Sequence, residues 1–223
     1  VGGAIRGNAG AFGKNMANIV SEVKVLNINN EITKYNPPAD GQISNKIQNP
    51  KLQIPNSLQA TGYGFQDCQF GYRDSIFKYN PNLIIISAKF ILKKGNKEEI
   101  ENKIKDIARK RSEKQPKGWY GCAGSFFKNP VVENEELRRG FIRDSGLQII
   151  ENRIPVGWII EEVGLKGKKI GNVMVSEKNA NFIINTGGGT AKEIVVLASI
   201  IKQKIRNDFG IQLEEEVKYV HNN

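Results

Sequence analysis

The chain has 223 residues, enough for one large domain or two small ones with cores of their own. Its 39% hydrophobic and 25% charged residues exclude a disordered tail, and no apolar run reaches the roughly 20 residues of a membrane span. A formal net charge of +10 fits either an anionic partner or lysines spread over solvated helix faces, so charge alone decides nothing.

The first predicted element is a half-buried strand over residues 19–28, where apolar and polar side chains alternate. The alternating residues are Val23, Val25 and Ile28 on one face and Glu22, Lys24 and Asn27 on the other. A turn at Asn29-Asn30 precedes a return strand over residues 31–35. Residues 36–66 are rich in Pro, Asn and Gln, and we expect a long polar connection there.

A second strong strand is predicted over residues 83–92, after the turn signal Asn80-Pro81-Asn82. Residues 96–113 then show the periodicity of an amphipathic helix, with charged residues opposite one apolar face. That face consists of Ile100, Ile104, Ile107 and Ala108. Pro116 ends the helix, and we expect a boundary there between two domains.

The second half of the chain begins with a predicted short helix that has Pro155 near its first turn and stops at Gly164. The apolar residues expected to point inward from this helix are Ile159, Ile160 and Val163. Two further strands are predicted over residues 170–175 and 181–185, where β-branched residues are frequent.

A glycine turn at residues 187–189 leads into a predicted helix from Thr190 to about Phe209. Thr190 and Glu193 have the spacing of a capping box, and apolar residues recur behind them at helical intervals. A last short strand is expected over residues 216–220. Because helices and strands mix without strict βαβ alternation, the sequence predicts an α+β fold.

The residue types that usually build catalytic and metal sites argue against several classes of enzyme. The only histidine, His221, lies three positions from the end of the chain, which disfavours a Ser-His-Asp triad, a zinc site or a histidine base. Cys68 and Cys122 form neither a CxxC pair nor a disulfide framework. No metal site is predicted, and without a signal peptide a cytoplasmic location is expected.

Several segments combine small residues with residues that could carry chemistry. The glycine-rich residues 1–13 could hold a phosphate, but such a loop alone is a weak signal and could be an ordinary tight connection. The glycines at 187–189 lack the Gly-Lys-Ser/Thr order of a phosphate loop, and a capped strand-to-helix turn explains them fully. Residues 121–130 lead from small residues to Ser125, two aromatics, a lysine and an asparagine. Residues 70–75 set a tyrosine beside an arginine at the end of a loop. Each segment alone could be a well-packed turn.

Taken together, five segments resemble, in order and at sensible spacing, the motifs of the UDP-N-acetylenolpyruvoylglucosamine reductases. The segments are VGGAIRGNAGAFG, FGYRDSIFK, KQP followed by CAGSFFKNP, GLKGKKIGNVMVSEKNANFIIN and FGIQLEEEV. The resemblance covers nearly the whole chain except residues 36–66 and a stretch after Pro130.

The resemblance implies an FAD-binding domain of the vanillyl-alcohol-oxidase type, followed by a smaller α+β domain that closes over the substrate. Residues 1–115 would be the remainder of the flavin domain and residues 116–223 the closing domain. The family's second flavin-contacting loop corresponds to the start of the chain, which implies cofactor-binding roles for Gly2, Gly3, Asn8, Ala9 and Gly10. The first pyrophosphate loop of the family lies upstream of Val1. We therefore expect an N-terminally truncated chain that holds FAD weakly by itself.

The family's reaction moves a hydride from NADPH to FAD and then to the enolpyruvyl group of a UDP-sugar. Negative charge builds next to the substrate carboxylate, so the chemistry needs a cation there and a proton donor. Arg73 matches the family's carboxylate-facing arginine, since a guanidinium binds a carboxylate in two places. Ser125 matches the proton-donating serine, and Glu216 matches the glutamate that completes the site.

The resemblance also implies that Tyr72, Lys114 and Asn129 help to hold the substrate and its diphosphate. The sequence departs from the family at Asn179, where a histidine is common, and we assign no role to that residue. The expected partners are the UDP-sugar and NADPH, with no nucleic acid and no membrane. The sequence leaves the oligomeric state open.

Two other functions remain possible on the sequence alone. One is a basic nucleic-acid-binding module, although the basic residues are spread out and aromatics do not recur between them as stacking platforms. The other is an inactive, truncated flavoprotein scaffold. A yellow protein whose flavin is bleached by NADPH would distinguish the enzyme from a colourless, salt-sensitive nucleic-acid binder.

Overall fold

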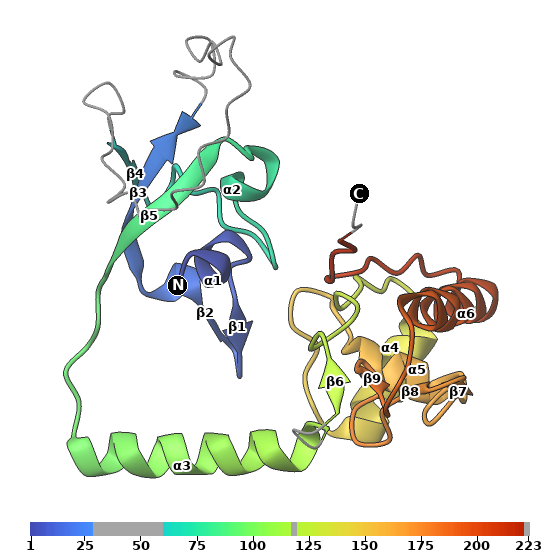
Figure 1. Cartoon of the computed structure of the whole chain (residues 1–223). Helices are drawn as coiled ribbons and strands as arrows, with labels where there is room; N and C mark the ends of the chain where they lie inside the picture. The colour runs from blue at the N-terminus through green and yellow to red at the C-terminus, as the bar shows by residue number, and fades with distance from the viewer. Residues whose placement is uncertain (29–59, 117–119, 221–223) are drawn as a thin grey trace, which may run out of the picture. The chain divides into compact units, whose positions relative to one another are not determined.

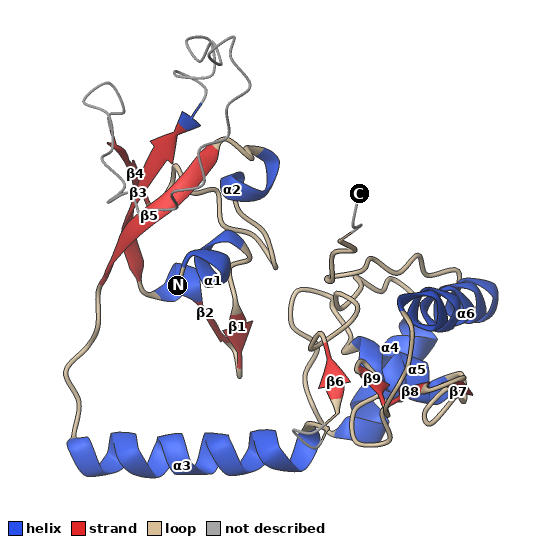
Figure 2. Ribbon diagram, viewed as in Figure 1, coloured by secondary structure: helices blue, strands red, loops and turns tan. Residues whose placement is uncertain are grey.

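The computed structural model describes residues 1–28, 60–116 and 120–220, and the chain divides into two compact units, Val1–Lys94 and Gly95–Asn223. Each unit combines helices with antiparallel strands (Figures 1 and 2), which confirms the predicted α+β class. The division precedes the helix that ends before Pro116, whereas the predicted boundary follows it. This helix has no buried residue, so apolar packing does not assign it to either unit.

The first unit is built on a three-stranded antiparallel sheet of order β4-β3-β5. The central strand β3 (Val20–Asn27) pairs with β4 (Ala60–Gly64) and with β5 (Leu83–Phe90), which confirms the strands predicted over residues 19–28 and 83–92. The return strand predicted over residues 31–35, and most of the polar connection after it, lie outside the described residues.

The glycine-rich start of the chain is more regular than a loop. It forms the helix α1 (Gly2–Arg6), the hairpin strands β1 (Gly10–Ala11) and β2 (Lys14–Asn15) and the 3₁₀ turn η1 (Met16–Asn18). Ile5 of α1 is fully buried with Val23 and Val25 of β3 and with Phe77 of the short helix α2 (Ile76–Tyr79). Burial of Ile5 against the sheet stabilises helix α1, which the many glycines of this segment did not indicate.

The helix α3 (Lys97–Lys114) confirms the helix predicted over residues 96–113. The side chain of Asn96 caps its start by accepting from the backbone N–H groups of Glu98 and Glu99. Its surface carries ion pairs one turn apart, such as Arg109 with Asp106 and Glu113. The predicted apolar face is largely solvent-exposed, with Ile104 61% exposed.

Besides α3, the described residues of the second unit form a four-stranded antiparallel sheet of order β6-β9-β8-β7 and three helices. These elements are β6 (Gly121–Cys122), α4 (Glu135–Ser145), α5 (Val156–Glu162), β7 (Lys169–Ile170), β8 (Val173–Val175), β9 (Ile183–Asn185) and α6 (Ala191–Phe209). All three helices bury apolar residues in the same core as the strands, for example Phe141 of α4, Ile159 of α5 and Ile201 of α6. This core also holds Phe126 and Phe127, the two residues that follow Ser125.

Three predictions for this unit are wrong or incomplete. Residues 170–175 are not one strand, because Gly171 has a φ of 54° and reverses the chain between β7 and β8. Residues 216–220 form no strand, and only an isolated bridge joins Phe127 to Glu215. Helix α4 was not predicted, although Asn134 caps it by accepting from the backbone N–H of Leu137.

Helix α6 begins at the predicted capping box. The Thr190 hydroxyl accepts from the backbone N–H of Glu193 at 3.2 Å, and the Glu193 carboxylate accepts from the backbone N–H of Thr190 at 2.7 Å. Gly210 ends the helix in the left-handed conformation, as its position after Phe209 predicts. None of the helices in the described part of the chain combines the length and apolar character that a bilayer crossing requires.

We expect Thr190→Ala to lower the free energy of unfolding by about 1 kcal/mol, because one backbone N–H of the first turn loses its acceptor. Urea denaturation followed by the circular dichroism of the helices measures this change. Gln203→Ala, at an exposed position of the same helix, is the matched control and should change the midpoint little. Equal midpoints for Thr190→Ala and the wild type would contradict the prediction.

Candidate functional site

The second unit brings three of the predicted site residues together. Lys114, Ser125 and Asn129 line one open cleft of about 430 Å³. The other residues that line it are Pro155, Gly157, Trp158, Glu161, Lys178, Asn179 and Asn181. The cleft therefore collects a hydroxyl, two lysines, one carboxylate and several amides from segments far apart in the sequence.

Ser125 lies at a turn that keeps it on the surface. Gly124 before it has a φ of 84°, a left-handed conformation that favours glycine. Phe126 and Phe127 after it are both buried, with ring centroids 4.9 Å apart in an edge-to-face arrangement. The glycine turn and the two buried rings leave Ser125 exposed at the cleft while its neighbours are anchored in the core.

The backbone of Glu216 is hydrogen-bonded to the segment that follows Ser125. Its N–H donates to the carbonyl of Phe126 at 2.8 Å, and Lys128 N–H donates to the carbonyl of Glu214 at 2.9 Å. The strand predicted over residues 216–220 does not form, but the residues just before it pair with the segment that follows Ser125. The structure thus pairs the backbone of Glu216 with Phe126, the residue after the predicted proton donor, whereas Glu216 is not among the residues that line the cleft of Ser125.

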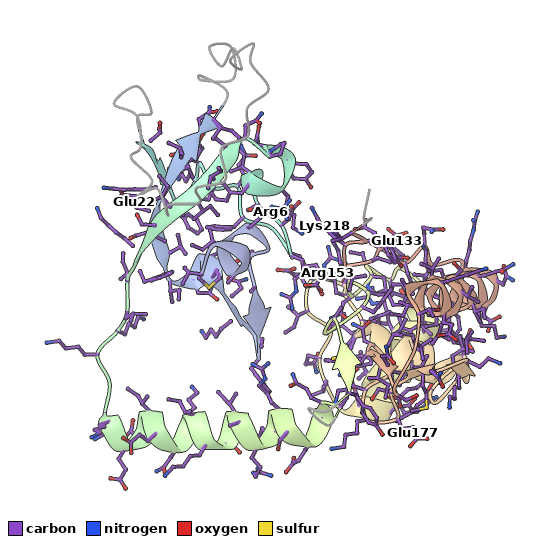
Figure 3. The ribbon with its side chains drawn as sticks, in the orientation of Figure 1. Arg6, Glu22, Glu133, Arg153, Glu177 and Lys218 are labelled. Carbon is purple, nitrogen blue, oxygen red and sulfur yellow. The ribbon has the colours of Figure 1, made fainter. Side chains whose placement is uncertain are left out.

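Asn129 supports the start of α5. Its Oδ1 accepts from the N–H of Val156, the first residue of that helix, at 3.1 Å. Its carbonyl accepts from Nη1 of Arg153 at 2.8 Å; Figure 3 labels Arg153. The side-chain oxygen of Asn129 therefore has a structural role at the wall of the cleft, and its contact with a substrate stays a prediction.

Two lysines approach the cleft from different elements. Lys114 ends α3, and Lys178 comes from the loop before β9 and donates to the carbonyl of Ser112 at 3.4 Å. The one carboxylate of the cleft, Glu161, forms an ion pair with Lys166 at 3.0 Å. Lys114 and Lys178 thus supply positive charge that suits an anionic ligand.

The predicted residues Tyr72 and Arg73 lie in the first unit, in a loop with an unusual backbone. Arg73 has a φ of 54°, which is uncommon for a residue with a side chain. Its Nη2 donates to the carbonyl of Gly10 at 3.0 Å, and its guanidinium carbon lies 5.4 Å from the centre of the Tyr72 ring. Lys78 donates to the carbonyl of Arg73.

Asp74, the neighbour that could have paired with Arg73, has other hydrogen bonds. Its carboxylate accepts from the hydroxyl of Tyr79 at 2.6 Å and from the N–H of Ser75 at 2.9 Å. The Gly10 carbonyl that accepts from Arg73 orients the guanidinium within the loop.

Asn8 fastens the Arg73 loop to the start of the chain. It is only 3% exposed; its Nδ2 donates to the carbonyl of Gly71 at 2.8 Å, and its Oδ1 accepts from the N–H of Ala17 at 2.9 Å. Ser75, also buried, donates its hydroxyl hydrogen to the carbonyl of Arg6 at 2.7 Å. Both the oxygen and the nitrogen of the Asn8 amide are therefore hydrogen-bonded to the backbone, so this side chain stabilises the contact between the Arg73 loop and the start of the chain.

Of the other residues predicted to bind the cofactor, some are needed by the local fold and one is accessible. A Cβ at Gly10 would lie 2.5 Å from the carbonyl oxygen of Lys14, so the hairpin itself requires that glycine. The N–H of Ala9 donates to the carbonyl of Ala4. At Gly3 a Cβ would meet no heavy atom within 4 Å, whereas at Gly2 it would lie 3.8 Å from Cβ of Ile85. Only Gly3 is therefore open on this side, while Asn8, Ala9 and Gly10 support the loop behind it.

The two cysteines differ sharply in exposure, and both are free thiols. Burial, together with the nearby Asp67, raises the pKa of the Cys68 thiol to about 11. Cys122 is exposed in β6, three positions before Ser125.

We expect iodoacetamide at pH 8 to alkylate Cys122 in the folded protein and to leave Cys68 unmodified, because the thiolate is the reactive form and the Cys68 thiol stays protonated. Peptide mass spectrometry gives the modification at each position, and labelling in urea should modify both. Equal labelling of the two cysteines in the folded protein would contradict the expectation.

Sequence reasoning missed several residues of the cleft. Asn181, Trp158 and Lys178 had no assigned role, since none of them has a spacing to other residues that marks a binding or catalytic site. The proximity of Asn179 was also missed: a Cβ at Gly157 would lie 3.0 Å from its Oδ1, so a side chain at that position would require the Asn179 side chain to shift.

Comparisons with known proteins point to one family. Residues 115–220 match the sequence model of the C-terminal domain of UDP-N-acetylenolpyruvoylglucosamine reductase. A reductase of this name from Solibacter usitatus is 34% identical over 99% of the chain and 61% of its own length. Another from Fervidobacterium nodosum is 37% identical over 98% of the chain and 54% of its own length. The crystal structure of the enzyme from Thermus caldophilus matches 98% of the chain and 59% of its own, with a TM-score of 0.62 and 28% identity. The chain thus spans a little over half the length of these relatives.

Proposed function

We propose that this chain belongs to the UDP-N-acetylenolpyruvoylglucosamine reductase family and carries most of the substrate site of an NADPH-dependent flavoenzyme; the matches to the C-terminal domain of that family and to its members support the proposal. The enzyme would reduce the enolpyruvyl group of UDP-N-acetylglucosamine enolpyruvate and form UDP-N-acetylmuramate for peptidoglycan synthesis. The observation that carries the proposal is the cleft in which Lys114, Ser125 and Asn129 meet, with Glu216 joined to the same segment.

The proposed roles follow from the groups that the reaction requires. Arg73 binds the substrate carboxylate and stabilises the negative charge that builds beside it. Ser125 donates a proton to the carbon next to that carboxylate, and Glu216 completes the site. Lys114 binds the diphosphate, and its positive charge also favours loss of the serine proton. Tyr72 and Asn129 help to hold the substrate.

FAD, when bound, supplies the transfer of a hydride from NADPH to the enolpyruvyl group. The open space at Gly3 supports close approach of the cofactor at the start of the chain, where Gly2 would also contribute. We assign residues 1–115 to an FAD-binding domain of the vanillyl-alcohol-oxidase type and residues 116–223 to the substrate-binding domain. We also place the protein in the cytoplasm, which its two free cysteines support.

The proposal is tested on the complete reading frame that contains this chain. The purified protein should be yellow, NADPH should bleach its flavin, and the enolpyruvyl UDP-sugar should restore the colour. Mass spectrometry should show a product two hydrogen atoms heavier than the substrate. A colourless protein that binds oligonucleotides with a steep salt dependence would contradict the proposal. So would a flavin that NADPH reduces and the substrate does not reoxidise.

A further inference from the structure

The residue that stands out beside the proposed proton donor is Asn181, a buried asparagine that is 7% exposed. Its Oδ1 accepts from the N–H of Phe127 at 2.9 Å, and its Nδ2 donates to the carbonyl of Phe127, also at 2.9 Å. Its own carbonyl accepts from the N–H of Phe126 at 2.7 Å. Three hydrogen bonds from one residue therefore hold the two residues that follow Ser125.

Asn181 is itself held in place. Its N–H donates to Oδ1 of Asn179 at 3.0 Å, and its neighbours Ala180 and Phe182 are buried in the core. Ser176, on the other side of the loop, donates its N–H to the carbonyl of Phe182 at 2.8 Å. The side-chain amide thus projects from a fixed backbone, so its position is set before any ligand binds.

The segment that Asn181 holds also has a partner on its opposite edge. The carbonyl of Phe126 accepts from the N–H of Glu216, and Phe127 bridges Glu215. The backbone of residues 126–127 is therefore paired with Asn181 on one side and with residues 215–216 on the other. Any shift of this segment would move both Ser125 and Glu216.

We infer that Asn181 is the positioning residue of the site: its amide fixes the backbone after Ser125 and so aims the Ser125 hydroxyl at the reacting carbon. The inference rests on the proposed function. A side-chain amide fits this position because it presents one acceptor and one donor in a plane, which meet the N–H and the carbonyl of Phe127. Leucine has a similar size and presents neither group.

The first test is Asn181→Leu in the complete protein, with the two half-reactions measured separately by stopped-flow absorbance. Reoxidation of the reduced flavin by the enolpyruvyl substrate should slow about 10- to 100-fold, since a small displacement of a reacting group has effects of that order. Flavin reduction by NADPH should keep its wild-type rate, because it does not use Ser125. A loss of folded protein alone would lower the amplitude of both half-reactions and leave both rates unchanged.

The second test is Asn181→Asp, which gives a pH profile that a purely structural role would not produce. A protonated carboxyl group has a donor and an acceptor and can replace the amide, whereas a carboxylate would face the Phe127 carbonyl with a second acceptor. Burial disfavours the charged form, so the pKa of the introduced carboxyl group should be raised. The substrate half-reaction of the variant should therefore recover, relative to wild type at the same pH, as the pH falls.

The ionisable groups around this position limit how far its pKa can rise. Lys114 of α3 and Lys178 of the same loop line the cleft with Asn181 and favour a carboxylate, while Glu161 of α5 opposes it. On the far edge of the held segment, Lys128 forms an ion pair with Glu214 at 2.6 Å. These groups are common to all the variants, so a recovery at low pH that is seen in Asn181→Asp and absent from Asn181→Leu belongs to the introduced carboxyl group.

The control is the exposed Asn207 of α6, where the same two substitutions should leave both half-reactions unchanged. Hydrogen–deuterium exchange of the Phe127 amide gives a readout without catalysis, and Asn181→Leu should accelerate that exchange. A folded Asn181→Leu variant with a wild-type rate of reoxidation overturns the inference, as does an Asn181→Asp variant without a pH-dependent recovery. If the wild-type protein does not reduce the substrate, the proposed function fails. In that case, unchanged exchange of the Phe127 amide in Asn181→Leu would also overturn the contact between Asn181 and Phe127, whereas faster exchange would support that contact.

Discussion

Ser125→Ala is expected to slow reoxidation of the reduced flavin by the enolpyruvyl substrate about 10²–10⁴-fold, which corresponds to about 3–5 kcal/mol in activation free energy. A serine hydroxyl is a very weak acid, and it can donate only because hydride transfer makes the facing carbon strongly basic. Lys114, which lines the same cleft, favours the alkoxide that forms. Lys128 is less suited to this role because its charge is paired with Glu214.

The measurement is stopped-flow absorbance of the flavin in each half-reaction of the complete protein. Reduction by NADPH should keep its wild-type rate, and substrate binding should be nearly unchanged, because neither uses the serine proton. Ser125→Cys should retain part of the activity, since a thiol can also donate a proton. Ser199→Ala, at an exposed position of α6, is the control. Wild-type reoxidation in Ser125→Ala would show that Ser125 is only a turn residue.

Arg73→Lys should reduce turnover about 10- to 100-fold, the equivalent of a lost charged hydrogen bond, while NADPH still reduces the flavin. A lysine keeps the positive charge but cannot donate in two places to a carboxylate. In the structure, one arm of the guanidinium already donates to the carbonyl of Gly10. The ammonium of a lysine would have to serve Gly10 and the substrate from a single nitrogen.

Steady-state kinetics of the complete protein, with the melting temperature measured in parallel, distinguish this role from a structural one. If Arg73 only supports its loop, Arg73→Lys should lower the melting temperature and leave turnover per folded molecule near wild type. Arg139→Lys, an exposed position on α4 where the arginine pairs with Glu135, is the matched control. It should change neither quantity appreciably.

Signals that act over a few residues predicted most of the secondary structure. The capping box of Thr190 and Glu193, and the glycine after Phe209, set the limits of α6 within one residue. The alternation around Val23 and Val25 correctly predicted β3 and its buried face. Helix α4 was missed although its cap, Asn134, and its terminal glycine, Gly146, were readable signals.

Errors occurred where a few residues admit two conformations. Residues 170–175 alternate well enough for one strand, but Gly171 takes a left-handed conformation and makes a hairpin of them. Residues 216–220 have strand-forming side chains without a partner strand in the described sheet, so only the bridge at Glu215 forms. Strand formation depends on an available neighbour, which composition does not reveal.

The sequence by itself determined the α+β class, the limits of α3 and α6 and, through its ordered motifs, the residues on which the proposed chemistry depends. Caps, turns and alternation act between residues a few positions apart, so they can be read along the chain. The tertiary structure decided which of these residues meet. Asn181 holds Phe127 across a separation of 54 residues, and Lys114 reaches the cleft of Ser125 from the end of another helix. The contact of Asn181 with Phe127 forms because both segments are packed in the core of the second unit, and no local pattern records that packing.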